Sequence, residues 1–237
     1  MLNTISVIIP NYNHAYVLMR ALESVAGQNR KDIEIIVVDD GSDETQKEHL
    51  RKKIMPQWPQ VKFIFSSHAG AATARNSGFR ESIGEYVIFW DADIAGQPDM
   101  LAKMKKALDE HPEASYAYSS FKFGWKKFVC GQFDAERLKQ MNFITTTSLI
   151  RREHFPGFDE SLKKFQDWDL WLTLLDQSHI GVWVPEVLFH IALKGTMSQW
   201  LPSFVYHFPW LPLSAIKKYF YWKTIVQKKH GINANSH

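Results

Sequence analysis

The chain has 237 residues, of which 45% are hydrophobic and 22% are charged, a balance typical of a globular protein and not of a disordered or fibrous one. The single cysteine, Cys130, excludes an internal disulfide framework, and no run of about 18 apolar residues predicts a membrane-spanning helix. The N-terminus lacks the basic segment of a secretion signal, so we expect a cytoplasmic protein.

The first 112 residues alternate between predicted strands and predicted helices. Hydrophobic, β-branched runs predict the strands, and apolar residues at helical spacing predict the helices. The predicted strands are 5–10, 33–38, 61–65 and 86–90, and the predicted helices are 15–27, 43–54, 69–82 and 97–109. Strands that alternate with helices form right-handed crossovers and a mostly parallel sheet, so we predict an α/β fold.

The residues after Pro112 follow a different pattern. Three aromatic or Thr-rich runs predict strands at 114–121, 123–129 and 145–151, followed by a helix at 167–175 and a strand at 182–188. There is no internal repeat and no low-complexity segment. We therefore expect residues 1–196 to form one domain of two halves, 1–112 and 113–196.

Carboxylates follow directly after two of the predicted strands. Asp39 and Asp40 end the second strand, and Asp91 and Asp93 follow the fourth. Ligands of open α/β sheets bind beyond the carboxyl ends of the strands, so these groups are expected to share one cleft. Mg²⁺ and Mn²⁺ prefer carboxylate oxygens together with phosphate oxygens, so the cleft suits a nucleotide and a divalent cation. Each short pattern by itself is more typical of a solvated loop or a helix cap.

Two further residues are candidates for chemistry. Arg75 follows a loop of small residues, where a guanidinium is suited to pair with a diphosphate. Asp167 begins a predicted helix beside Trp168, and a nearby apolar wall raises a carboxyl pKa toward the range of a general base. Taken alone, Arg75 is also typical of a protein surface and Asp167 of a helix cap. The sequence lacks the glycine fingerprint of dehydrogenases and the Walker motif of P-loop enzymes.

Six segments that occur in a fixed order make the chain resemble the family 2 inverting glycosyltransferases of the GT-A fold. These segments are Ser6–Asn13, Val37–Ser42, Ala74–Gly78, Gly84–Asp93, Phe158–Glu160 and Asp167–Trp171. The resemblance covers roughly residues 4–198. It implies a mostly parallel central sheet flanked by helices, followed by an aromatic and basic helical extension.

The resemblance implies a role for each matched residue. The residues that it implies for nucleotide binding are Pro10, Tyr12, Asp39, Asp40, Arg75 and Asp91. Pro10 and Tyr12 would line the base pocket, and Asp40 would bind the uracil. Asp93, together with Asp91, would hold Mn²⁺ or Mg²⁺, and Asp167 would be the general base.

The implied reaction is the inverting transfer of one sugar from a nucleotide sugar, with a UDP-sugar expected, to a hydroxyl of a glycan or lipid-linked acceptor. Cell-surface glycan synthesis is the expected setting, and no nucleic-acid partner is expected. Residues 1–112 would bind the nucleotide, residues 113–196 would bind the acceptor, and together they would form the catalytic domain. The processive-synthase pattern Gln-x-x-Arg-Trp is missing, which favours a single addition.

The chain departs from the family pattern at two positions. Gln166 replaces the acid that usually precedes the base, and Lys194 occupies the position of a family histidine. Two alternatives therefore stay open. One is a nucleotide-sugar or glycan-binding module without turnover, and the other is a metal-dependent nucleotidyl or phosphoryl transferase that would release pyrophosphate instead of UDP.

Residues 197–237 form a tail of unusual composition. Beyond Glu186 the chain has six lysines and no acid, so residues 187–237 carry +6 and the rest of the chain carries −3. Clustered aromatic rings and lysines favour an anionic membrane surface. We expect peripheral attachment to the cytoplasmic membrane face, through a helix from Ser214 that turns Tyr219 and Trp222 toward lipid. The alternative is a tail that packs on the preceding domain or forms an oligomer contact.

Overall fold

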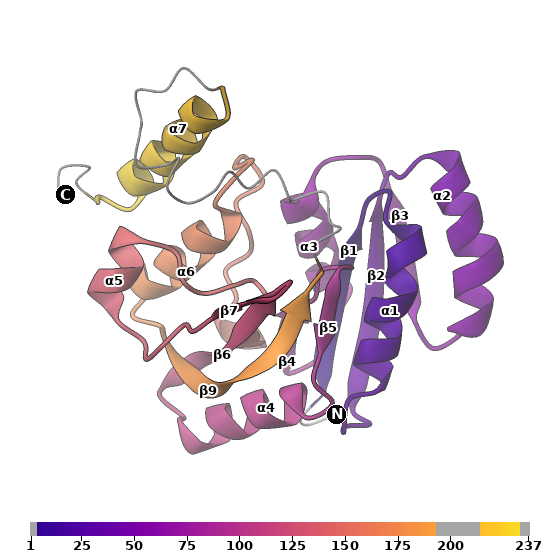
Figure 1. Ribbon diagram of the computed structural model, residues 1–237, viewed down its shortest axis with the longest axis horizontal. Coiled ribbons are helices and arrows are strands. Elements are labelled where there is room, and N and C mark those ends of the chain that lie inside the picture. The colour runs from indigo at the N-terminus through magenta and orange to yellow at the C-terminus, as the bar shows by residue number, and fades with distance from the viewer. Residues whose placement is uncertain (1–3, 193–213, 233–237) are drawn as a thin grey trace.

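The computed structural model describes residues 4–192 and 214–232 of the chain. A nine-stranded mixed sheet forms its centre, and helices pack on the sheet (Figure 1). The strands are β1 (Ile5–Asn11), β2 (Ile33–Asp40), β3 (Lys62–Ser66), β4 (Tyr86–Phe89), β5 (Ile94–Gly96), β6 (Ala114–Phe123), β7 (Lys126–Phe128), β8 (Leu149–Arg151) and β9 (Ile180–Ile191). The helices are α1 (Ala15–Ala26), α2 (Glu44–His49), α3 (Ala71–Arg80), α4 (Met100–Glu110), α5 (Ala135–Gln140), α6 (Gln166–Asp176) and α7 (Ser214–Lys229).

The strand order is β3-β2-β1-β4-β8-β6-β9-β5, and β7 pairs with β6 outside this path. The strands β1 to β4 are mutually parallel. The strand β8 is antiparallel to both β4 and β6, and β9 is parallel to β6, so β6 and β9 run in the same direction as β4. The carboxyl ends of β1, β2, β4, β6 and β9 therefore lie at one edge of the sheet.

Two hydrophobic clusters cover the two faces of the sheet. One contains Leu22 of α1 and Met104 of α4, and the other contains Phe89 of β4 and Trp171 of α6. Strands that are buried on both faces need continuous hydrophobic runs, and β1, β2 and β4 have them. The helix α3 approaches the sheet closely at Gly78, where a Cβ atom would lie 2.4 Å from Cγ2 of Ile8.

The predicted elements are present, with additions. The predicted helix 43–54 begins with Asp43 as its cap, whose carboxylate accepts a hydrogen bond from the amide of Gln46. It continues from α2 into a π-helical segment, Leu50–Ile54. The sequence pattern does not predict β5 and α5, because segments of three and six residues are too short to display a period.

The C-terminal helix α7 packs against the rest of the protein. Val226 is fully buried, and Trp222 packs on the cluster that contains α6. The ring of Tyr219 meets that of Phe165 edge-on at 5.0 Å. The prediction that Tyr219 and Trp222 face lipid is therefore wrong, because both rings find apolar partners on the domain. Packing on the preceding domain holds for α7, while residues 197–213 lie outside the described part of the chain.

Ion pairs complete the contact between α7 and the domain. Lys229 Nζ lies 2.7 Å from Asp159 Oδ2 and 2.8 Å from Asp169 Oδ1. The imidazole of His230, with its side chain 4% exposed, lies between Asp169 and Asp176 at 2.9 and 2.6 Å. None of the described helices is long and apolar enough to cross a membrane.

Candidate active site

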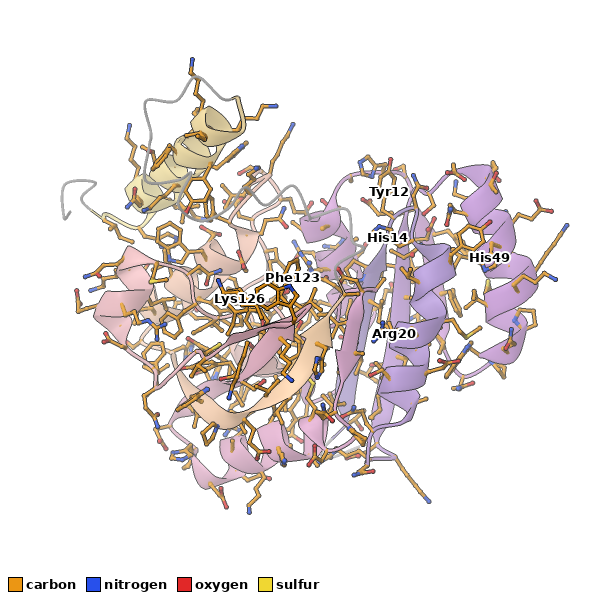
Figure 2. All side chains as sticks on the ribbon, in the orientation of Figure 1. Tyr12, His14, Arg20, His49, Phe123 and Lys126 are labelled. Atoms are coloured by element: carbon orange, nitrogen blue, oxygen red, sulfur yellow. The ribbon has the colours of Figure 1, made fainter. Side chains whose placement is uncertain are left out.

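The predicted ligand-binding residues gather at the edge where the parallel strands end. Tyr12 follows β1, Asp40 ends β2 and Asp91 follows β4 by two residues. Pro10 is half-buried in β1, beside Val38 of β2. Figure 2 shows Tyr12 and His14 together near the start of α1. The topology thus brings these separate segments to one place, as the sequence predicts.

An exposed aromatic pair lies beside a buried carboxylate at this edge. Tyr12 is 44% exposed, and its ring stacks on that of His68 at a centroid distance of 4.1 Å. His68 Nδ1 lies 2.9 Å from Asp40 Oδ2. The amides of Ala69 and Gly70 donate hydrogen bonds of 2.8 and 2.9 Å to the same carboxylate. Aromatic faces next to a fixed acceptor suit the recognition of a planar base.

Asp39 points into the protein. Its carboxylate accepts hydrogen bonds from Asn11 Nδ2 at 2.8 Å and from Ser42 Oγ at 2.5 Å, and its residue is 1% exposed. Gly41, with a φ of +70°, makes the turn between Asp39 and Ser42. Asp39 therefore braces the loops that carry Tyr12 and Asp40, and its direct contact with a nucleotide stays a prediction.

Arg75 connects the two halves of the candidate site. Its Nη2 donates to Asp91 Oδ1 at 2.7 Å, and its Nη1 donates to Gln166 Oε1 at 3.4 Å. The side chain is 8% exposed and lies over the ring of Phe158. Its buried Nε makes no hydrogen bond with the described residues, so an unpaired donor is left for a ligand oxygen or water. In this structure Arg75 positions Asp91, and a diphosphate contact stays a prediction.

Asp93 is half-buried next to Asp91. Burial raises the pKa of the Asp93 carboxyl, the negative charge of Asp91 raises it further, and a backbone hydrogen bond and the charge of His14 oppose both. Two carboxylates that repel each other favour a cation between them. Within the described residues, no three His, Cys, Asp or Glu side chains converge to form a complete metal site. Asp91 and Asp93 nevertheless fit a hard cation whose remaining ligands are phosphate oxygens and water.

Asp167 is held at the start of α6. Its Oδ2 accepts a hydrogen bond of 2.7 Å from Asn142 Nδ2, and its Oδ1 accepts one of 2.9 Å from the amide of Trp168. Burial raises the pKa of the Asp167 carboxyl, although the Trp168 amide, the charge of Arg75 and the Asn142 hydrogen bond oppose this shift. The residue is partly exposed at the start of α6, and its carboxyl has the raised basicity that a general base needs.

The turn before α6 is strained. Phe165 has a φ of +60°, in the left-handed region that side chains with a Cβ rarely adopt. Its ring packs edge-on against Trp168 and against Tyr219 of α7. Strain of this kind persists where surrounding contacts over-determine it, and here those contacts fix the entry of Gln166 and Asp167 into the helix.

The sequence pattern does not point to three residues of the site. These are His14, His68 and Asn142, which lie in loops or at a helix end without any periodic pattern. Asn142 precedes a buried segment and is separated from Asp167 by 25 positions, so only the fold reveals their contact. Lys194, where the chain departs from the family pattern, lies outside the described residues.

Comparisons with known proteins identify a family and a fold. The model of the family described as glycosyl transferase family 2 matches residues 6–166. An uncharacterized glycosyltransferase of Nostoc is 43% identical over 101 residues, which are 42% of this chain and 31% of the relative. One of Rickettsia felis is 28% identical over 191 residues, 75% of this chain and 31% of the relative. The chain thus spans about a third of the length of these relatives.

Solved structures of glycosyltransferases have the same fold. S. aureus TarS in complex with UDP-GlcNAc superposes with a TM-score of 0.67 at 20% identity, covering 87% of this chain and 64% of that one. The mannosyltransferase PcManGT of Pyrobaculum calidifontis, in complex with GDP-Man and Mn²⁺, has a TM-score of 0.66 at 17% identity, with 97% and 70% covered. At these identities the likeness establishes the GT-A fold.

Proposed function

Because the chain belongs to glycosyl transferase family 2, we propose that it transfers a single sugar from a nucleotide sugar to an acceptor hydroxyl with inversion at the anomeric carbon. The observation that carries this proposal is the link between the two halves of the candidate site. Arg75 joins Asp91, on the nucleotide side, to Gln166, the neighbour of the candidate base Asp167. Residues 1–112 would supply the donor side, and residues 113–196 the acceptor side.

The proposed donor is a UDP-sugar. The stacked pair of Tyr12 and His68 offers a flat surface for the base, and the Asp40 carboxylate lies beside it as a hydrogen-bond acceptor for a uracil N3–H. The likeness to a protein solved with UDP-GlcNAc supports this choice, whereas the neighbour solved with GDP-Man makes a guanine nucleotide the first alternative to test.

The proposed mechanism is one displacement. Asp167 accepts the proton of the acceptor hydroxyl while the hydroxyl oxygen attacks C1 of the sugar from the face opposite the diphosphate. The bond between C1 and the phosphate oxygen breaks, and UDP leaves with the electron pair. Asp91 and Asp93 would hold Mn²⁺ or Mg²⁺, which supplies positive charge to the leaving diphosphate. Asn142 keeps the Asp167 carboxylate oriented through its amide hydrogen bond.

A donor screen tests this proposal. Purified protein is incubated with UDP-, GDP- and dTDP-sugars, with and without Mn²⁺, and nucleotide release is measured together with the anomeric configuration of the transferred sugar. We expect UDP release that depends on the metal, and a product of inverted configuration. Binding without any turnover would favour the binding module, release of pyrophosphate would favour a nucleotidyl transferase, and retained configuration would exclude the single displacement.

The proposal extends to a membrane surface on the cytoplasmic side. The outward face of α7 carries the exposed residues Lys217, Lys218, Tyr221 and Lys228, with Tyr221 61% exposed. Lysines near an anionic leaflet contribute roughly 1 kcal/mol each, and a tyrosine ring suits the interface. This face would bring the enzyme to a lipid-linked acceptor in cell-surface glycan synthesis.

A further inference from the structure

The hairpin of β6 and β7 presents an unusual side chain at its tip. Phe123 pairs with Lys126, which leaves Gly124 and Trp125 as a two-residue turn. Gly124 has a φ of +57°, as the first central residue of a type II′ turn requires. Trp125 is 88% exposed, although tryptophan is usually largely buried. The turn therefore holds a large apolar ring in the solvent.

The base of the hairpin is rigid. The Phe121 ring stacks on that of Phe128 at 5.0 Å and on that of Phe189 in β9 at 5.4 Å, with interplanar angles of 5° and 8°. Lys126 Nζ lies 4.9 Å from the centre of the Phe128 ring. These contacts fix the hairpin against β9 without using Trp125, so the exposed ring is not needed to hold the hairpin in place.

All the charged side chains of the hairpin are positive. Lys122, Lys126 and Lys127 surround the turn, and residues 114–133 contain no aspartate or glutamate. Among the residues that the structure describes, no carboxylate forms a salt bridge with any of these three lysines, while most other lysines of the catalytic domain have such partners. Their charge is therefore available to an anionic ligand.

The hairpin tip lies at the edge of the sheet that carries the candidate site. The strand β6 runs in the direction of β4, so its carboxyl end and that of β4 share an edge. The amide of Gly124 donates to Ile191 O at 3.1 Å, and the amide of Ala192 donates to Asp93 O at 3.0 Å. Only the end of β9 therefore separates the hairpin from Asp93, and Figure 2 shows Phe123 and Lys126 in the middle of the molecule.

We propose that this hairpin binds the acceptor and that the acceptor is an anionic glycan, with Trp125 stacked on a sugar ring and Lys126 and Lys127 paired with carboxylate or phosphate groups. The proposal rests on the proposed function and names the acceptor class for the same site. An aromatic face beside cations suits a charged carbohydrate, since the ring covers apolar C–H groups and the lysines meet the anion. A lipid bilayer is the less suitable partner, because a membrane on this edge would block the entry of the nucleotide.

Affinity electrophoresis of the full chain tests the proposal. The gels contain carboxymethyl-dextran, or unmodified dextran as the neutral polymer of the same backbone. Wild-type protein is expected to be retarded in gels with carboxymethyl-dextran and not in gels with unmodified dextran. Trp125→Ala and the double variant Lys126→Glu/Lys127→Glu are each expected to bind carboxymethyl-dextran at least about tenfold more weakly, since the first loses the stacking ring and the second loses the charged contacts.

The control is the double variant Lys31→Glu/Lys53→Glu, which makes the same change of charge at two exposed lysines away from the hairpin. It is expected to bind as the wild type does. No retardation of the wild type, equal loss in the control, or full binding by Lys126→Glu/Lys127→Glu would overturn the proposal. The proposal would also be overturned if the wild type bound phosphatidylglycerol vesicles but not the polymer, and the hairpin variants lost that vesicle binding.

UDP binding and UDP release from the donor are measured in parallel, so that a failure of the acceptor proposal can be distinguished from a failure of the proposed function. Hairpin variants that lose polymer binding but still bind UDP with wild-type affinity support an acceptor surface. Polymer binding by a wild-type protein that releases no nucleotide from any donor would refute the proposed function and leave the anionic-glycan surface standing.

Discussion

At the scale of single residues, Asp93 is the candidate binding group on which burial and charge act most clearly. Its pKa is raised because its carboxylate is partly desolvated and lies near Asp91. A folded protein keeps such an unfavourable pair where a cation or a proton relieves it. Arg75 forms a salt bridge of 2.7 Å with Asp91 and so balances its negative charge. The Asp93 carboxylate is therefore the member of the pair whose charge is left to attract a cation.

The first prediction concerns the variant Asp93→Ala. We expect Mn²⁺ to lose its effect on UDP-sugar turnover, and the rate to fall by about 10²-fold or more, because a bound cation supplies several kcal/mol of charge stabilisation. The measurement is the initial rate across a Mn²⁺ titration. Glu23→Ala, at an exposed carboxylate of α1, is the control. An unchanged metal response in Asp93→Ala would show that the cation binds elsewhere.

The second prediction concerns pH and Asn142. The pKa of Asp167 is raised, so the base is protonated at a higher pH than an exposed aspartate, and transfer falls as the pH drops through that value. The Asn142 hydrogen bond lowers this pKa, so Asn142→Ala is expected to raise it further and to move the acid limb of the rate profile to higher pH. Profiles of kcat/KM for both proteins measure the shift. A limb that moves to lower pH, or does not move, would contradict the assignment.

At the scale of elements, α7 is held on α6 by charge as well as by apolar packing. Burial lowers the pKa of His230, but its hydrogen bonds to Asp169 and Asp176 outweigh burial and leave the pKa raised. The same Asp169 also binds Lys229. Because Asp169 lies two residues after Asp167, this contact ties the C-terminal helix to the helix that carries the candidate base.

The third prediction follows from the sign of this shift. A raised folded-state pKa gives a stability contribution that is fully present below the unfolded pKa of about 6.5 and is lost as the pH rises through the folded value. We expect His230→Gln to lower Tm by roughly 2–4 °C for each kcal/mol lost, more at about pH 6 than at about pH 9. Thermal scans at both pH values measure this, with His111→Gln as the control. A Tm difference that grows with pH would contradict the proposed ion pairing.

The sequence predicted long elements well and short ones poorly. The runs in β1, β2 and β4 are continuous and hydrophobic because both faces of the sheet are covered, and α1 has an apolar face that meets the sheet. The strand β5 forms because it pairs with β9, and its own three residues carry no pattern. The sequence predicts the aromatic stripe of α7 but not the surface on which it packs, because apolar rings suit lipid and protein alike.

At the scale of the whole molecule, the candidate site follows from topology. The ends of β1, β2 and β4 bring Tyr12, Asp40 and Asp91 to one edge, which the alternation of strands and helices made predictable. The partners of these residues were not predictable, since contacts such as Asn142 with Asp167 depend on how loops from distant segments pack. The link from Arg75 to Gln166 likewise joins residues 91 positions apart.

The fourth prediction concerns attachment of the whole protein to a membrane. We expect the full chain to float with vesicles that contain phosphatidylglycerol, and the triple variant Lys217→Glu/Lys218→Glu/Lys228→Glu to stay in solution while keeping its Tm. These lysines are exposed on α7, so their reversal should not disturb the buried face around Val226. Flotation of both proteins to the same extent would remove α7 from the membrane contact.

Transfer by the variant Asp167→Asn is the measurement that tests the account most directly. Asn is nearly isosteric but cannot accept the proton, so we predict that kcat falls on the order of 10²–10⁴-fold, while Tm and the affinity for UDP stay at wild-type values. Glu23→Gln, at an exposed carboxylate of α1, should behave as the wild type. If Asp167→Asn transferred sugar at a near wild-type rate, Asp167 would not be the base, and the single-displacement mechanism built on it would be wrong.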